Sequence, residues 1–390
     1  MRWRVFALTW LAYASYYFCR RNFSITKSTV AADLDLSTRA LGLIDTGYLV
    51  AYAIGQFAAG PLGDRIGPRR LVGAGMIASA VFTAWTGSAS AAAGLALSLA
   101  LNGVAQATGW PGTVQAMTPF FGRAQRGWIM GLWSTCYQVG GLAAGALCAA
   151  LLKSIDWRAA YTLPALWVAL VGGLVLLALP EGARATAGER QAARARLVRD
   201  PVFWSLGLAY FCLKLIRYSL LFWLPFYLER SLGYARGDAG YQSLSFEVGG
   251  TGGAVLLGLL SDRWLGGRRG IAGLVGCLSL ALALLLYIAV GHLGPLWNFA
   301  ALALVGLTLI GPDALLSGAA AQDLGGREAA ATTAGFVNGM GSVGAILQGV
   351  ITAEVSVRLG WSALFWVFLV LALLAALAMI PCVRAERQRR

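Results

Sequence analysis

Residues 60–65 are Gly60-Pro-Leu-Gly-Asp64-Arg65, and residues 258–263 are Gly258-Leu-Leu-Ser-Asp262-Arg263. Each motif follows a long apolar stretch, and the two motifs lie 198 residues apart in a chain of 390 residues. Gly42 and Gly240, which open these two apolar stretches, are separated by the same 198 residues. A repeat of this length predicts that the chain consists of two halves built on one plan.

The composition places both halves in a membrane. Hydrophobic residues make up 58% of the chain and charged residues only 12%, whereas soluble domains contain roughly 25% charged residues. Apolar stretches recur along the whole chain, many of them near the roughly 20 residues that a helix needs to cross the hydrocarbon core. We therefore predict an all-α membrane protein with about twelve transmembrane helices, at residues 5–30, 37–63, 70–88, 90–119, 124–152, 157–179, 201–229, 237–262, 270–291, 294–320, 329–357 and 360–382.

The longest polar stretch, Glu181 to Asp200, lies near the centre of the chain. We expect an N-terminal six-helix bundle over residues 1–180, a cytoplasmic linker over 181–200 and a C-terminal six-helix bundle over 201–390. In transporters with internal repeats the substrate site lies near the membrane midplane, at the interface of the repeats. The same location is expected here.

The net charge of +14 reflects topology rather than affinity for nucleic acid. With the N-terminus inside, the cytoplasmic segments contain 20 arginines and the outer segments contain six Lys or Arg residues. Such an excess is the positive-inside signal. It predicts that both termini are cytoplasmic in a multi-pass protein of a cell membrane, the inner membrane of a bacterium.

Cysteine and histidine usage excludes several classes of site. The six cysteines are scattered through or beside the apolar stretches, and His292 is the single histidine. These residues suggest neither a disulfide framework nor a metal site. There is no nucleophile–base constellation and no Gly-x-x-x-x-Gly-Lys-Ser/Thr phosphate loop. We therefore expect no enzyme activity, no cofactor and no ATP-driven pumping.

Two arginines are expected near the middle of equivalent helices. Arg20 is central in the first span and Arg217 in the seventh, and Lys214 lies three residues before Arg217. A charge at this depth costs at least a few kcal/mol, so it indicates function. Guanidinium groups bind phosphate in a bidentate manner. The alternative is that each arginine pairs with a distant carboxylate for packing; the sequence favours an anion site.

Helical spacing adds candidates to this site. Tyr13, Tyr17 and Arg20 are spaced four and three residues apart, and so would share one face of a helix. Tyr52 and Gln56 are four residues apart in the second span and could line the same cavity.

Three acidic residues also occur within spans: Asp45, Glu247 and Asp313. Each could pair with a basic residue, carry a coupled proton or contact the substrate. Glu247 could neutralise Lys214 or Arg217 when the substrate is absent. The sequence does not separate these roles.

The repeated Asp-Arg motifs have two interpretations. In the first, Arg65 and Arg263 only orient the helices in the membrane. In the second, Asp64 and Asp262 pair with arginines across the cytoplasmic face and form gates together with Arg65 and Arg263. The occurrence of both motifs at equivalent positions favours gates.

These residues resemble a known family. Gly60-x-x-x-Asp64-Arg65-x-Gly67-x-Arg69-Arg70, with twelve spans and a central loop, is similar to the major facilitator superfamily. Further stretches resemble its organophosphate:phosphate antiporters and sugar-phosphate exchangers, relatives of the glucose-6-phosphate and glycerol-3-phosphate transporters. They are Tyr16-Tyr17-Phe18-Cys19-Arg20-Arg21-Asn22, Tyr52-Ala53-Ile54-Gly55-Gln56-Phe57, Gly109-Trp110-Pro111, Lys214-Leu-Ile-Arg217-Tyr218, Glu247-Val-Gly-Gly250, Gly311-Pro312 and Ala334-Gly335-Phe336.

The resemblance implies exchange of inorganic phosphate and a phosphate ester at one site by a rocker-switch motion. It assigns phosphate binding to Arg20 and Arg217, and cavity positions to Tyr13, Tyr17, Tyr52 and Trp110. Two positions depart from the glycerol-phosphate pattern: Gln56 replaces a lysine and Tyr137 replaces a histidine. Asp313 is also foreign to that pattern and could bind a substrate hydroxyl.

The sequence thus predicts a monomeric secondary transporter that exchanges a phosphorylated metabolite for inorganic phosphate in a lipid bilayer. One alternative is a proton-coupled transporter of another organic anion, with Glu247 or Asp313 as the proton carrier. Another is a sugar-phosphate sensor that binds its ligand without transport.

Overall fold

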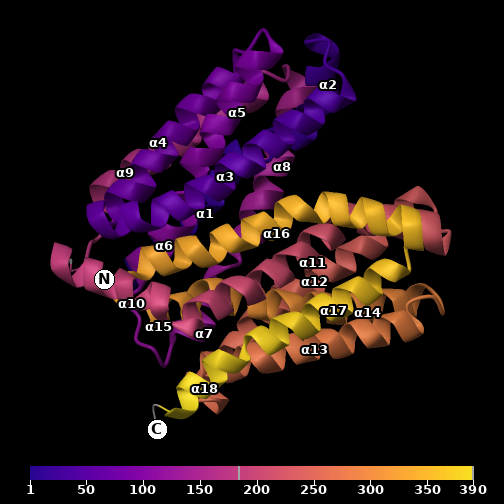
Figure 1. Cartoon of the computed structure of the whole chain (residues 1–390). Helices are drawn as coiled ribbons and strands as arrows, with labels where there is room; N and C mark the ends of the chain where they lie inside the picture. Colours follow the sequence, from indigo (N-terminus) through magenta and orange to yellow (C-terminus); the bar gives the residue numbers. More distant parts are fainter. Residues whose placement is uncertain (183–184, 389–390) are drawn as a thin grey trace. The chain divides into compact units, whose positions relative to one another are not determined.

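The computed structural model describes residues 1–182 and 185–388, and in these ranges the chain is helical with short connections and no strand (Figure 1). The prediction of an all-α fold is confirmed. Arg184, Arg389 and Arg390, which belong to the 20 arginines expected in the cytoplasm, lie outside the described residues.

The elements of the first half and the linker are as follows. They are α1 (Arg2–Tyr16), η1 (Tyr17–Cys19), α2 (Asn22–Asp33), α3 (Thr38–Ile66), α4 (Pro68–Gly87), α5 (Ala92–Gln106), α6 (Gly109–Met117), α7 (Arg126–Trp133), α8 (Cys136–Ser154), α9 (Ala159–Ala178) and α10 (Ala187–Arg199).

The second half begins directly after Asp200, which separates α10 from α11. Its elements are α11 (Pro201–Leu232), α12 (Arg236–Leu259), the π-helical turn η2 (Leu260–Trp264), α13 (Arg269–Val290), α14 (Pro295–Leu315), the π-helical turn η3 (Leu316–Ala320), α15 (Ala321–Gly325), α16 (Ala330–Leu359), α17 (Ala363–Ala378) and α18 (Ile380–Gln388).

Each expected span corresponds to one helical stretch of the described residues, and several stretches contain more than one element. Within residues 1–182 and 185–388, eight stretches are long and apolar enough to cross a membrane. Breaks divide the first and fourth spans into shorter helices, while α3 and α4 are long but contain more polar residues. Large apolar side chains such as Leu142, Leu177 and Val357 are 77–84% exposed on the outer surface, as expected for a surface that faces lipid.

Local sequence signals explain where the long helices begin and end. The Ser37 hydroxyl accepts a hydrogen bond from Ala40 N at 3.2 Å and caps α3. The Asp200 carboxylate accepts one from Val202 N at 2.8 Å, directly before Pro201 at the first position of α11. At the other end of α11, Gly233 adopts a left-handed conformation with φ 72°, which glycine adopts without steric cost.

The chain forms two compact units, each described by itself below. Unit 1 contains Met1–Phe121, Trp133–Ala195 and Leu324–Gly339, and unit 2 contains Gly122–Leu132, Arg196–Asp323 and Met340–Arg390. Each unit thus includes a short piece of the opposite half of the sequence. The division into bundles at residues 1–180, 181–200 and 201–390 stays a prediction.

Each unit has an apolar core of its own. In unit 1, buried residues that include Phe23, Leu95 and Tyr161 form one continuous cluster. In unit 2, the ring centroid of Phe365 lies 4.9 Å from that of Tyr227 and 4.4 Å from that of Tyr287. These cores fix the helices that carry the polar side chains described below.

Unit 2 depends on close contact between α12 and α14. A Cβ atom added at Gly253 would lie 1.9 Å from the Leu307 carbonyl oxygen, whereas one added at Gly252 would make an ordinary contact of 3.8 Å with Leu307 Cδ1. We expect Gly253→Ala to destabilise the protein by about 1–3 kcal/mol through overpacking. Gly252→Ala, the matched control, is expected to melt at or above the wild-type temperature. Thermal unfolding in detergent measures both, and equal melting temperatures would contradict the prediction.

Candidate functional site

The first span is broken at its centre. The α-helix α1 ends at Tyr16, Tyr17–Cys19 form a 3₁₀ turn, and α2 begins at Asn22. The expectation of a continuous helix over residues 5–30 is therefore wrong at this point. Arg20 lies in this break. Its backbone nitrogen bonds at 3.1 Å to the oxygen of Tyr17, three residues earlier, as in a 3₁₀ turn and not as in an α-helix.

Two amide side chains from α5 stabilise the break. Asn102 Nδ2 donates to Cys19 O at 2.8 Å, and Gln106 Nε2 donates to Tyr16 O at 3.0 Å. Ser79 links the two amides, since it donates to Asn102 Oδ1 at 2.7 Å and accepts from Gln106 Nε2 at 2.8 Å. A broken helix in a membrane requires such partners for its freed carbonyl groups. The sequence interpretation missed these two amides, although two amides four residues apart in an apolar span are a signal.

The same glutamine orients Arg20. Nε and Nη2 of Arg20 both donate to Gln106 Oε1, at 3.2 and 3.1 Å. Because Gln106 Nε2 is engaged with Tyr16 O, the amide oxygen must face the guanidinium group. Arg20 also lies over the rings of Tyr17 and Tyr52, 5.1 and 5.0 Å from their centroids. No carboxylate among the described residues pairs with Arg20.

Aromatic side chains form a wall beside Arg20. The Tyr13 ring centroid lies 6.3 Å from that of Tyr17, 5.5 Å from that of Trp110 and 5.5 Å from that of Tyr137. Trp133, which the sequence interpretation missed, completes the cluster at 5.3 Å from Tyr13. Unit 1 thus brings five of the predicted site residues together with Arg20: Tyr13, Tyr17, Tyr52, Trp110 and Tyr137.

Gln56 and Arg21 are placed differently. Gln56, one helical turn after Tyr52, is fully buried, and neither its amide nitrogen nor its amide oxygen has a hydrogen-bond partner among the described residues. A buried amide without partners is costly. Arg21, next to Arg20, is exposed.

Unit 2 holds the second cationic cluster. Arg217 Nη1 donates to Asp313 Oδ2 at 2.6 Å, and Lys214 Nζ lies 3.1 Å from Asp313 Oδ1. The Lys214 ammonium also lies 5.0 and 5.6 Å from the ring centroids of Tyr210 and Tyr218. All three charged side chains are largely buried, with 12%, 13% and 1% exposure for Lys214, Arg217 and Asp313. Two cations on α11 therefore share one carboxylate from α14.

The other intramembrane acids lie apart from this cluster. Glu247 is half-buried on α12, and the carboxylate that pairs with Lys214 and Arg217 is that of Asp313 instead. Asp45 on α3 forms an ion pair with Lys27 on α2.

Asp64, from the first repeated motif, binds the start of a helix in unit 1. Its Oδ1 accepts from Ala331 N at 3.0 Å, and its Oδ2 accepts from Thr332 N at 3.0 Å and from Thr332 Oγ1 at 2.5 Å. These are the first-turn N–H groups of α16, which have no partner within the helix and carry its positive dipole end. Arg194 of the linker helix α10 lies 3.9 Å from Asp64 and donates to Pro61 O at 2.7 Å.

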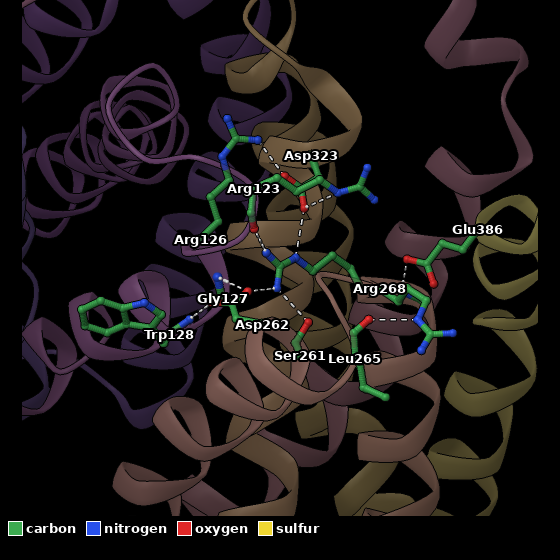
Figure 2. A network of polar contacts seen from close by, with 12 residues as sticks. Arg123, Arg126, Gly127, Trp128, Ser261, Asp262, Leu265, Arg268, Asp323 and Glu386 are labelled. Atoms are coloured by element: carbon green, nitrogen blue, oxygen red, sulfur yellow. Dashed lines mark hydrogen bonds and ion pairs between the residues drawn. The ribbon is translucent and has the colours of Figure 1, made fainter. Parts of the chain in front are cut away.

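Asp262, from the second repeated motif, binds the start of a helix in unit 2 in the same way. It accepts from Gly127 N at 3.2 Å and from Trp128 N at 2.8 Å, in the first turn of α7 (Figure 2). Arg269 Nη1 donates to Asp262 at 2.5 Å and to Ser261 Oγ at 2.7 Å. The two repeated aspartates thus have equivalent roles.

A second carboxylate extends this network. Asp323 accepts from Arg126 Nη1 at 2.6 Å and from Arg269 Nε at 3.0 Å, and Arg123 Nε lies 3.6 Å away (Figure 2). Arg65 and Arg263, which were expected to join the gates, are exposed, and the ion pairs of Asp64 and Asp262 among the described residues are with other arginines. The guanidinium groups beside the two motifs come from Arg194 and Arg269.

Comparison with known proteins identifies the fold. A family model of the Major Facilitator Superfamily matches residues 9–349. The chain belongs to this superfamily. It is therefore a multi-pass membrane transporter, as the sequence predicted.

Relatives and solved structures agree with this membership. The chain is 32% identical to "Putative glycerol-3-phosphate transporter 2" of Arabidopsis thaliana, over 98% of this chain and 86% of the relative. It is 28% identical to "Sugar phosphate exchanger 3" of Xenopus laevis, over 99% of this chain and 93% of the relative. The crystal structure of the human organic anion transporter MFSD10 has the same superfamily fold, with a TM-score of 0.74, 15% identity and coverage of 97% of this chain and 99% of that chain.

Proposed function

We propose that this transporter exchanges a phosphorylated metabolite, either a sugar phosphate or a glycerol phosphate, for inorganic phosphate by alternating access. The observation that carries the proposal is Arg20, an intramembrane guanidinium held by the neutral amide of Gln106 and by aromatic rings. A partly buried cation whose partners are neutral attracts an anion. The names of the relatives, a glycerol-3-phosphate transporter and a sugar phosphate exchanger, support a phosphate ester as that anion.

The proposal assigns roles to the two clusters. Arg20 and Arg217 bind the phosphate group, and Lys214 assists. The remaining predicted site residues shape or tune the cavity: Tyr13, Tyr17, Tyr52, Gln56, Trp110, Tyr137, Glu247 and Asp313. In the Gln56 side chain, the unpartnered amide nitrogen and oxygen are the groups offered to a substrate hydroxyl or phosphate oxygen.

Gating is assigned to Asp64 and Asp262, which act through the first-turn N–H groups of α16 and α7. Arg65 and Arg263 contribute to the gates as surface charges beside these carboxylates. In this proposal the hydrogen bonds that the two aspartates accept break and re-form as access alternates. The two access states then differ in their contacts, as they must if a substrate is to shift the equilibrium between them.

We further propose that the protein works as a monomer in the inner membrane of a cell, with both termini in the cytoplasm. The 20 arginines on one side of the expected topology support this orientation.

Exchange in proteoliposomes tests the function. Purified protein is reconstituted into vesicles that contain unlabelled phosphate or no phosphate, and uptake of labelled phosphate is followed without a pH gradient. We expect saturable uptake only into phosphate-loaded vesicles. Uptake that follows a pH gradient and needs no internal phosphate would favour the proton-coupled carrier instead. Binding of a sugar phosphate with no flux would favour the sensor.

Gln106 provides a matched test of the anion site. Gln106→Glu keeps the shape of the side chain but places a carboxylate against Arg20, so we expect loss of phosphate exchange because the carboxylate replaces the substrate anion. Gln106→Ala, which removes the orienting oxygen, is expected to reduce exchange about tenfold. Both variants are assayed by labelled-phosphate exchange at equal reconstituted protein. Wild-type exchange by Gln106→Glu would contradict the assignment of Arg20.

A further inference from the structure

Unit 2 contains an anion of its own at the position proposed for substrate phosphate. Asp313 is 1% exposed, and its carboxylate engages both cations of α11: Arg217 Nη1 at 2.6 Å and Lys214 Nζ at 3.1 Å. The cluster of Lys214, Arg217 and Asp313 therefore carries a net charge of +1 instead of +2. Any substrate that binds Arg217 meets the Asp313 carboxylate at the same place.

The effect of Asp313 depends on what the substrate carries besides phosphate. A phosphate group that accepts the hydrogen bond from Arg217 Nη1 replaces Asp313 Oδ2 there. The Asp313 carboxylate can then accept a hydrogen bond from a hydroxyl group of the same substrate. A carboxylate on the substrate would instead approach a fixed carboxylate of like charge, which is strongly unfavourable in a desolvated site. Discrimination by repulsion of the wrong substrate is a common route to specificity.

We propose that Asp313 is the specificity-determining residue of the α11 cluster. It admits phosphate esters whose organic part carries hydroxyl groups and rejects esters that carry a carboxylate. This inference rests on the proposed phosphate exchange.

Two matched pairs of compounds test the proposal. Glycerol 3-phosphate has a hydroxymethyl group where 3-phosphoglycerate has a carboxylate. Glucose 6-phosphate has a hydroxyl-bearing C1 where 6-phosphogluconate has a carboxylate. Each compound competes with labelled phosphate for exchange in proteoliposomes. The readout is a ratio within each pair: the inhibition constant of the carboxylate compound divided by that of the hydroxyl compound. We expect the wild-type protein to prefer the hydroxyl member of at least one pair by about tenfold or more.

The variants are expected to change this ratio in opposite directions. Asp313→Asn removes the repelling charge and lowers the ratio at least about tenfold. Lys214→Gln leaves Asp313 paired with Arg217 alone and raises the ratio. Glu354→Gln, which removes an acid that is 55% exposed and pairs with Arg358, is the charge-matched control and leaves the ratio unchanged.

The outcomes separate this inference from the proposed function. Absence of phosphate exchange by the folded wild-type protein defeats the function itself. Normal phosphate exchange with an equal ratio in wild type and Asp313→Asn overturns the role of Asp313 alone. If Asp313→Asn does not fold, the Lys214→Gln ratio decides: a rise supports the proposal, and an unchanged or lower ratio overturns it.

Discussion

Replacing Arg20 with lysine is expected to lower phosphate exchange at least about 100-fold, and Arg20→Ala is expected to abolish it. The guanidinium group is held in one orientation by two hydrogen bonds to Gln106 Oε1 and by the rings of Tyr17 and Tyr52. A lysine keeps the charge but is a single point donor, so it reproduces neither the bidentate geometry for phosphate nor the stacking.

Arg21 supplies the control for this experiment. It follows Arg20 directly, but its side chain is exposed. We expect Arg21→Lys to exchange phosphate at the wild-type rate, measured in the same vesicles at equal protein density. Equal activity of Arg20→Lys and Arg21→Lys would show that Arg20 does not bind the substrate.

The second large effect is expected from Arg269→Met. Arg269 is 4% exposed and donates to Asp262, Asp323, Ser261 and the carbonyl of Arg123 (Figure 2). Among the described residues, its removal leaves Asp262 without an ion-pair partner and Asp323 without one of its three. Removing one member of a buried ion pair costs about 3–5 kcal/mol. That is a large share of the roughly 5–15 kcal/mol by which native domains are stable.

The neighbouring residue again serves as the control. Arg268 is half-buried and donates to Leu265 O at 2.9 Å, and it binds no carboxylate among the described residues. We expect Arg268→Met to melt within a few degrees of the wild type, since such substitutions cost little. Arg269→Met is expected to melt far below it or to yield no folded protein. Matching thermal unfolding curves for both variants would contradict the role given to the network.

Much of the fold follows from the sequence because its signals are local or repeated. The apolar stretches predicted the twelve helical stretches of the described residues. Helical spacing also predicted that Tyr13 and Tyr17 lie close together, because three- and four-residue spacings survive a short 3₁₀ turn. Those features need no knowledge of distant contacts.

The rest could not be predicted because it depends on contacts between distant residues. Nothing in Tyr16–Asn22 is a glycine or proline, so the break at Arg20 has no local signal; its freed carbonyls are bound by Asn102 and Gln106, more than 80 residues away. The choice of Asp313 over Glu247 as the partner of Arg217 depends on how α12 and α14 are rotated. The partners of Asp64 and Asp262 were missed because the sequence does not show which helix start lies against a carboxylate more than 130 residues away.

The central claim, that phosphate and a phosphate ester use one site in turn, is tested most directly by trans-stimulation. Proteoliposomes are loaded with labelled phosphate, and its efflux is measured with no pH gradient before and after a sugar phosphate is added outside. We predict slow efflux into plain buffer and a saturable acceleration on adding the ester, absent in Arg20→Ala. Efflux that is unaffected by glucose 6-phosphate, glycerol 3-phosphate and external phosphate alike would contradict the exchange mechanism.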